Sequence, residues 1–171
     1  LTLDGGGDAN SLFIIKCVAG FSTAASAVVS LVNGASPENI YWIAQDAISL
    51  GASTTIQGTI ISNSLAVSAG ASCTVTGSMF TKAGAVTFGP GIISTPANPS
   101  PHIDLRGLAS FVLYTCNGGV GNTTSSTYNG DIATNSGAIT GFTAEGNVVK
   151  GGGYQAGTTA VVTPVDQVAT F

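Results

Sequence analysis

Two consecutive stretches decide the fold: GASTTIQGTIISNSLAVSA at residues 51–69 and GASCTVTGSMFTKAGAVTF at residues 70–88. Apolar residues and glycines recur in them at an offset of 19 positions, and the matched pairs are Ile56–Val75, Gly58–Gly77, Ile60–Met79 and Ile61–Phe80. A repeat of this length is typical of one coil of a β-solenoid, in which coils stack at strand spacing and matched apolar residues form an inward ladder. The matched glycines predict corners where a side chain would obstruct the turn.

The β pattern continues along most of the chain. Short runs of Thr, Val, Ile and Ser, punctuated by Gly or Asn-Gly, predict strands at residues 12–18, 27–32, 40–43, 54–61, 73–80, 85–88, 111–115 and 147–150. Residues 94–101 carry three prolines, which lack the backbone donor of a β ladder, so this segment is expected to be an extended linker. Near the C-terminus, Thr163-Pro164 followed by Asp166 resembles a helix start, and a frayed tail is the alternative.

Charge is scarce throughout the chain. Four Lys and Arg and eight Asp and Glu give a net charge of −4, which argues against nucleic acid as a partner because phosphate binding needs clustered cations. Only 7% of residues are charged, against about 25% in an ordinary soluble domain. Such a surface is expected to face a solid or to pack against other copies. No apolar run reaches the ~18 residues that span a bilayer, so no membrane insertion is expected. Because the chain starts at Leu1 without a signal peptide, we interpret it as a mature or excised fragment.

No group of side chains predicts catalysis, a cofactor or a metal. The acids are spread one at a time, whereas solenoids that cleave polysaccharides need grouped carboxylates. Asp4 and Asp8 flank three glycines, a pattern that fits a weak cation site or, as we favour, a solvated glycine-rich turn. His102 lies in the proline-rich linker, a poor place for a rigid general base. An odd cysteine count leaves at least one thiol unpaired, no zinc spacing is present, and buried apolar roles are expected for Cys17, Cys73 and Cys116.

Ladders of Ser and Thr are the candidate for function. At the 19-residue offset, Ser49, Ser68 and Thr87 stack on one another, as do Thr54 with Cys73, Thr55 with Thr74, Gln57 with Thr76, and Thr59 with Ser78. A flat face of short hydroxyls and methyls, with little rotamer freedom, can hold water in an ordered array. The alternative is that Thr and Ser are simply good outward residues on any strand. The candidate surface residues are Ser49, Thr54, Thr55, Thr59, Ser68, Thr74, Thr76, Ser78 and Thr87.

A family resemblance covers residues 1–93. The stretches that carry it are Leu1 to Asp4, Asp8 to Ile15, Val32 to Ala35, Asn39 to Trp42, and Ala47 to Thr87. They resemble the later half of domains in the microbial ice-binding-protein family. Ser110 to Leu113, Asn129 to Asn135 and Ile139 to Phe142 resemble the earlier half of the same domains. The halves therefore stand in permuted order, and the family's long helix is missing or survives only as a stub at residues 164–171.

The resemblance implies a domain plan. Residues 1–93 would be the later half of an ice-binding-like solenoid, residues 94–104 a linker, and residues 105–171 the earlier half, completing the same domain or a neighbouring copy. A fragment of a tandem array, a circular permutation and subunits that complete their neighbours all fit this order. In the last case head-to-tail association would build an open filament. The fold class predicted is all-β, an irregular right-handed β-solenoid (β-helix) with little helix.

Two functions follow as expectations. The first is a non-catalytic, secreted, extracellular or cell-surface ice-binding (antifreeze) module that adsorbs to ice through a flat Thr/Ser face, without a cofactor. The alternative is a self-assembling structural subunit of an extracellular filament or adhesin repeat, whose partners would be other copies of itself. Its motives are the permuted halves, the low charge and the mean hydropathy of +0.43. An enzyme is not expected in either case.

Overall fold

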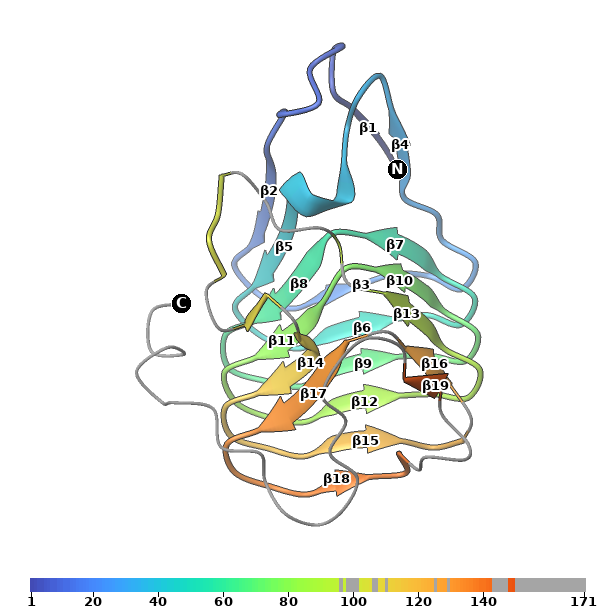
Figure 1. The fold of residues 1–171 in the computed structure, drawn as a ribbon, viewed down its shortest axis with the longest axis vertical. Coiled ribbons are helices and arrows are strands. Elements are labelled where there is room, and N and C mark those ends of the chain that lie inside the picture. The colour runs from blue at the N-terminus through green and yellow to red at the C-terminus, as the bar shows by residue number, and fades with distance from the viewer. Residues whose placement is uncertain are drawn as a thin grey trace.

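Stacked coils of parallel β-strands make up the protein (Figure 1). The computed structural model describes residues 1–95, 97, 102–105, 108–109, 111–124, 126–128, 130–142 and 148–149. Every pairing between its strands is parallel, and the described elements include one short 3-10 helix, η1 (Pro37–Asn39). The predicted all-β solenoid is therefore confirmed. The helix expected near the C-terminus lies outside the described residues.

Three sheets form the walls of the solenoid. Sheet I contains β2 (Phe13–Cys17), β5 (Ile40–Ala44), β8 (Thr59–Ser62), β11 (Met79–Thr81), β14 (Phe111–Thr115) and β17 (Asp131–Thr134). Sheet II contains β3 (Phe21–Ser22), β6 (Ile48–Leu50), β9 (Val67–Ala69), β12 (Val86–Phe88), β15 (Val120–Asn122) and β18 (Ile139–Thr140). Sheet III contains β7 (Thr55–Gln57), β10 (Thr74–Thr76), β13 (Ile93–Thr95), β16 (Thr127–Tyr128) and β19 (Val148–Val149). A separate pair, β1 (Thr2–Asp4) with β4 (Ser30–Val32), lies at the N-terminal end.

The 19-residue repeat sets the register between coils, as predicted. Ile56 lies opposite Val75 in sheet III, and the same offset pairs strands in sheets I and II. The chain turns between β7 and β8 at Gly58, whose φ is 105°, and turns again one layer on at Gly77, whose φ is 149°. A Cβ atom on Gly77 would overlap the carbonyl oxygen of Gly58, so backbone stacks directly on backbone at this corner. The runs predicted as single strands at 54–61 and 73–80 are therefore each divided in two by a glycine.

The core is a set of inward ladders that run along the solenoid axis. Each layer adds one side chain, and all of them are at most 3% exposed. The ladder of sheet I consists of Trp42, Ile60, Met79, Leu113 and Ile132, and that of sheet II consists of Ile48, Val67, Val86, Val120 and Ile139. Burying a side chain of this size stabilises a fold by about 1.5–3 kcal/mol.

The proline-rich segment interrupts the repeat without ending the solenoid. β13 includes Ser94 and Thr95, which pair with β10, so the ladder expected to stop at residue 94 continues to the residue before the first proline. β14 then stacks on β11 of the same chain at an offset of 34 residues, 15 more than the repeat. Between the two, residues 102–105 and 108–109, here called the strap, lie outside sheet I. Association between half-domains of different copies stays a prediction.

Buried hydroxyls hold the corner between sheets I and II. The four residues at equivalent positions on successive layers are Ser62, Thr81, Thr115 and Thr134, each at most 2% exposed. The Thr81 hydroxyl donates to the carbonyls of Leu65 and Ala83, both at 2.7 Å, and accepts from the Ala83 N–H at 3.2 Å. Because the corner backbone has no strand partner there, these side chains supply the hydrogen bonds that its polar groups need.

Thr81→Val is expected to lower the free energy of unfolding by about 1–3 kcal/mol, because it leaves buried backbone groups without their partner while conserving volume. Urea denaturation followed by circular dichroism measures the loss. Thr81→Ser keeps the hydroxyl and is the matched control, expected to regain most of the difference. Equal midpoints for the valine variant and the original chain would contradict the role given to this hydroxyl.

Candidate functional site

The three walls present different outer surfaces. On sheet I, bulky side chains such as Ile61, Phe80 and Tyr114 point outward and pack against the strap. On sheet II, the outward residues are all small. On sheet III, Thr and Gln alternate with buried Ile and Val. Only sheet II combines a long stack of layers with uniformly short outward side chains among the residues that the structure describes.

One column of hydroxyl-bearing residues runs along the middle of sheet II. Because alternate residues of a strand face opposite sides, each coil contributes one outward residue between two buried ones. The strand registers place these outward residues one above another over six layers: Ser22, Ser49, Ser68, Thr87, Gly121 and Thr140. The hydroxyl oxygens of Ser49 and Ser68 are 3.4 Å apart. At strand spacing, six layers extend over about 24 Å.

Columns of alanine and glycine flank the hydroxyl column. Two positions earlier in each coil lie Gly20, Ala47, Ala66, Ala85, Gly119 and Ala138, and backbone hydrogen bonds join these positions between layers. Two positions later lie Gly51, Gly70 and Gly89. None of these residues has a side chain longer than one carbon, so nothing rises above the hydroxyls and methyls of the central column. The outer surface of sheet II is therefore a regular, neutral array, here called the sheet II face.

Sheet III carries a second, less regular column. Thr55 pairs with Thr74, and Gln57 pairs with Thr76, as the 19-residue offset predicts. The next layer places Ile93 opposite Thr74, so the threonine column is interrupted. The Gln57 side chain donates to the carbonyl of Val29 at 3.4 Å. This wall is thus mixed in size and in chemistry.

The nine candidate residues do not share one surface. Ser49, Ser68 and Thr87 stack on sheet II, whereas Thr55, Thr74 and Thr76 lie on sheet III. The other three, Thr54, Thr59 and Ser78, are at most 5% exposed. The hydroxyl of Thr54 is 2.8 Å from that of Thr23, and the hydroxyl of Ser78 donates to the carbonyl of Phe111 at 2.7 Å. These three side chains serve internal hydrogen bonds and are not available to a surface.

Sequence reasoning missed half of the sheet II column. Ser22, Gly121 and Thr140 complete it at the two ends, where strands are short and the offset is altered by the insertion. A signal was present, because every coil carries a triplet of one small, one apolar and one small residue: Gly-Phe-Ser at 20–22, Ala-Ile-Ser at 47–49, Ala-Val-Ser at 66–68, Ala-Val-Thr at 85–87, Gly-Val-Gly at 119–121 and Ala-Ile-Thr at 138–140.

The described charged side chains lie away from the sheet II face. Asp4 and Asp8 belong to the N-terminal turns, where each carboxylate accepts a nearby backbone N–H at 2.8 Å. The hydrogen bond from Gly6, with a second from the Asn33 amide, holds the pKa of Asp4 below its usual value. Among the described residues no group of three His, Cys, Asp or Glu gathers as a metal site would require. The glycine-rich turn with solvated acids is what this segment forms.

The cysteines offer no reactive centre. All three are free, and burial raises the pKa of the Cys73 thiol, which is fully enclosed and donates to the Gly51 carbonyl at 3.2 Å. A raised pKa keeps a thiol protonated and a poor nucleophile. In the part of the chain that the structure describes, no helix has the length and apolar character to cross a membrane.

Comparison with known proteins identifies the family. Residues 1–93 match the family described as ice-binding-like. Searches of curated proteins and of solved structures returned no significant match. The family match covers the N-terminal end and the first coils, including four of the six layers of the sheet II face, and spans more than half of the chain. The protein is a member of the ice-binding-like family.

Proposed function

We propose that the protein adsorbs to ice through the sheet II face. The single observation that carries this proposal is the six-layer column of Ser, Thr and Gly between columns of Ala and Gly. Membership of the ice-binding-like family supports the choice of ice as the ligand. Sheets I and III lack an equally uniform surface, because one carries large apolar side chains and the other carries Gln57 and an isoleucine in register with its threonines.

The chemistry required is the ordering of water by a rigid surface. Backbone hydrogen bonds between layers fix the spacing of the hydroxyls, so little conformational entropy is lost when the face meets an ordered lattice. Hydroxyls donate to and accept from lattice water, while the methyls of Ala and Thr release water that they order poorly. Many such weak contacts over one face replace a single strong site. No cofactor and no covalent step are part of this function.

The protein is proposed to act outside the cell, secreted or at the cell surface, with ice as its partner. The family supports this placement, since ice that threatens a cell grows first in the surrounding water. The low charge of the chain fits a surface that meets a neutral solid.

The purified chain is expected to show thermal hysteresis and to inhibit ice recrystallisation as a monomer, because one face of one copy holds the whole array. Nanolitre osmometry and a recrystallisation assay measure these two effects, and size-exclusion chromatography establishes the assembly state of the same sample. A folded monomer that leaves ice growth unchanged in both assays would exclude ice adsorption. Activity only in assembled material would exclude the single-face version.

A further inference from the structure

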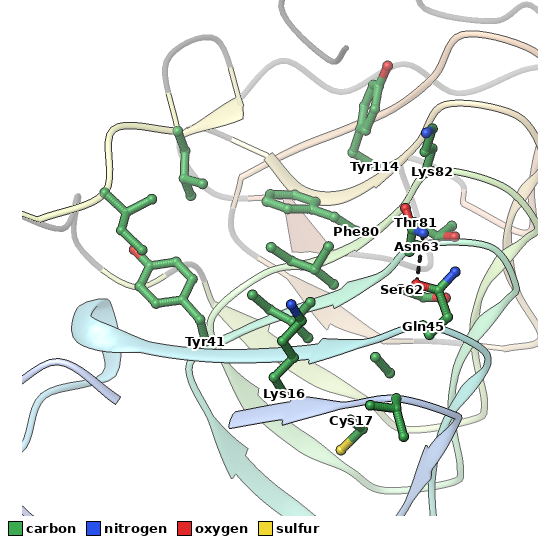
Figure 2. Close-up of a pocket in the computed structure, with 16 residues that line it drawn as sticks. Lys16, Cys17, Tyr41, Gln45, Ser62, Asn63, Phe80, Thr81, Lys82 and Tyr114 are labelled. Atoms are coloured by element: carbon green, nitrogen blue, oxygen red, sulfur yellow. Dashed lines mark hydrogen bonds between the residues drawn. The ribbon is translucent and has the colours of Figure 1, made fainter. Parts of the chain in front are cut away.

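A cavity of about 500 Å³ lies on the opposite side of the protein's chemistry from the sheet II face, between the outer surface of sheet I and the strap. Figure 2 shows the side chains that line it, with aromatic and aliphatic groups in the centre and polar groups toward one side. This volume falls within the range of small-molecule pockets, which are mostly apolar with a few polar groups that fix orientation. The ice-adsorption proposal makes no use of it.

The floor of the cavity is a column of apolar side chains along the solenoid axis. The registers of sheet I align Ile43, Ile61, Phe80 and Tyr114 on four successive layers. At strand spacing, this column extends over about 14 Å. Phe80 and Tyr114 are buried beneath the strap, whereas Ile43 and Ile61 are only half-buried. The floor is therefore an elongated apolar track that is open toward the N-terminal end.

The strap forms one wall. Ile103 and Leu105 line the cavity, and Leu108 packs with Phe80 and Tyr114. At the far end of the strap, His102 Nε2 lies 2.7 Å from the carbonyl oxygen of Asn10 in the N-terminal turns. The strap is thus attached at both ends of the cavity, which leaves a narrow channel beside it.

Two amines stand at the rim. Lys16 and Lys82 both line the cavity, and Lys16 precedes the apolar column by one layer because it pairs with Ile43. Gln45 and Asn63, joined by a hydrogen bond of 3.1 Å, lie between the two lysines along the polar side. None of the lining residues is acidic. In a chain with four cations and a net charge of −4, this is a local concentration of positive charge next to an apolar track.

We propose that this cavity binds a long-chain carboxylate, such as a fatty acid. The alkyl chain lies along the Ile43–Tyr114 column, and the carboxylate lies between the amines of Lys16 and Lys82. The volume favours a single extended chain over a docked helix, because even two helical turns about 10 Å across occupy on the order of 900 Å³. Apolar contact supplies most of the affinity and the lysines supply the preference for an anion.

Isothermal titration calorimetry of the full chain with sodium palmitate tests the proposal. Binding of one palmitate per chain is expected, and shortening the acid by two carbons is expected to weaken the affinity roughly 15-fold. Hexadecanol, which has the same chain without the charge, is expected to bind more weakly than palmitate. Hexadecyltrimethylammonium, which reverses the charge, is expected to bind more weakly still.

Variants separate this site from non-specific adsorption. The double variant Lys16→Gln/Lys82→Gln is expected to weaken palmitate binding about three- to tenfold and to remove the preference over hexadecanol, whereas Lys16→Arg/Lys82→Arg retains both. Both lysines are exposed, so neither pair of substitutions disturbs the core. Thermal hysteresis is expected to be equal with and without palmitate, because the sheet II face lies on another wall.

Three results would overturn the proposal. Palmitate that fails to bind the full chain below its micelle concentration shows that the cavity does not accept this ligand. Affinity that is unchanged by both chain length and the glutamine substitutions places the binding elsewhere. A dimer in sedimentation velocity that does not bind palmitate shows that a second copy covers the cavity instead. None of these results bears on ice adsorption, which is tested by a separate assay.

Discussion

Replacing Ser68 with tyrosine is expected to abolish thermal hysteresis while leaving the fold intact. Ser68 occupies the third of six layers in the sheet II column, between Ser49 and Thr87. A tyrosine ring there rises above the alanine and glycine columns and keeps a flat lattice from contacting several layers at once. The side chain points outward and is half-buried, so the ring does not enter the core, and the melting temperature is expected to change little.

Two matched variants make this result specific. Ser68→Thr adds one methyl to a column that already contains Thr87 and Thr140, and is expected to keep full activity. Thr74→Tyr places the same ring on sheet III and is expected to leave activity unchanged, because sheets II and III are different walls. Osmometry of all three, at equal concentration and with circular dichroism as the fold check, decides the face. Loss of activity in Thr74→Tyr alone would move the ice-binding surface to sheet III.

The repeat in the sequence was sufficient to predict how the coils stack. An offset of 19 residues pairs Ile56 with Val75 and Ser68 with Thr87, and both pairs are in register in the structure. This succeeded because a solenoid converts a sequence period directly into vertical neighbours, with no long-range topology to guess. The glycines at the matched corner were also predicted, since a turn that stacks backbone on backbone admits no side chain.

The repeat could not tell an outward residue from an inward one. Thr54 and Thr55 are adjacent and equally polar, yet Thr54 is fully buried and Thr55 is half-exposed. Alternation along a strand predicts direction only within one strand, and each coil changes direction at three corners. Thr81 and Thr115 illustrate the same difficulty, because their burial depends on corner carbonyls that no local pattern reveals. The strap was missed as a wall because its partners on sheet I are distant in sequence.

Gly77→Ala is expected to be the most destabilising small substitution in the solenoid. The φ of Gly77 is 149°, a conformation that costs a residue with a side chain about 1–3 kcal/mol. The new methyl would also overlap the Gly58 backbone in the neighbouring layer, which adds about 1–3 kcal/mol of overpacking. A loss of about 2–6 kcal/mol is a large share of the 5–15 kcal/mol typical of a domain. The melting temperature should fall by roughly 5–20 °C.

Gly121→Ala is the control that isolates this effect. Gly121 lies in the sheet II column, and a Cβ atom there would meet only ordinary contacts, 3.6 Å from the Thr140 hydroxyl and 3.8 Å from a Thr87 methyl. The same change of glycine to alanine is therefore expected to be neutral or to raise stability by up to about 1 kcal/mol, because it restricts the unfolded chain. Ice activity should persist, since alanine is no taller than the flanking columns. Thermal melts of the two variants that coincide would mean that Gly58 and Gly77 do not stack, and the coils would then have to be wound in a different register.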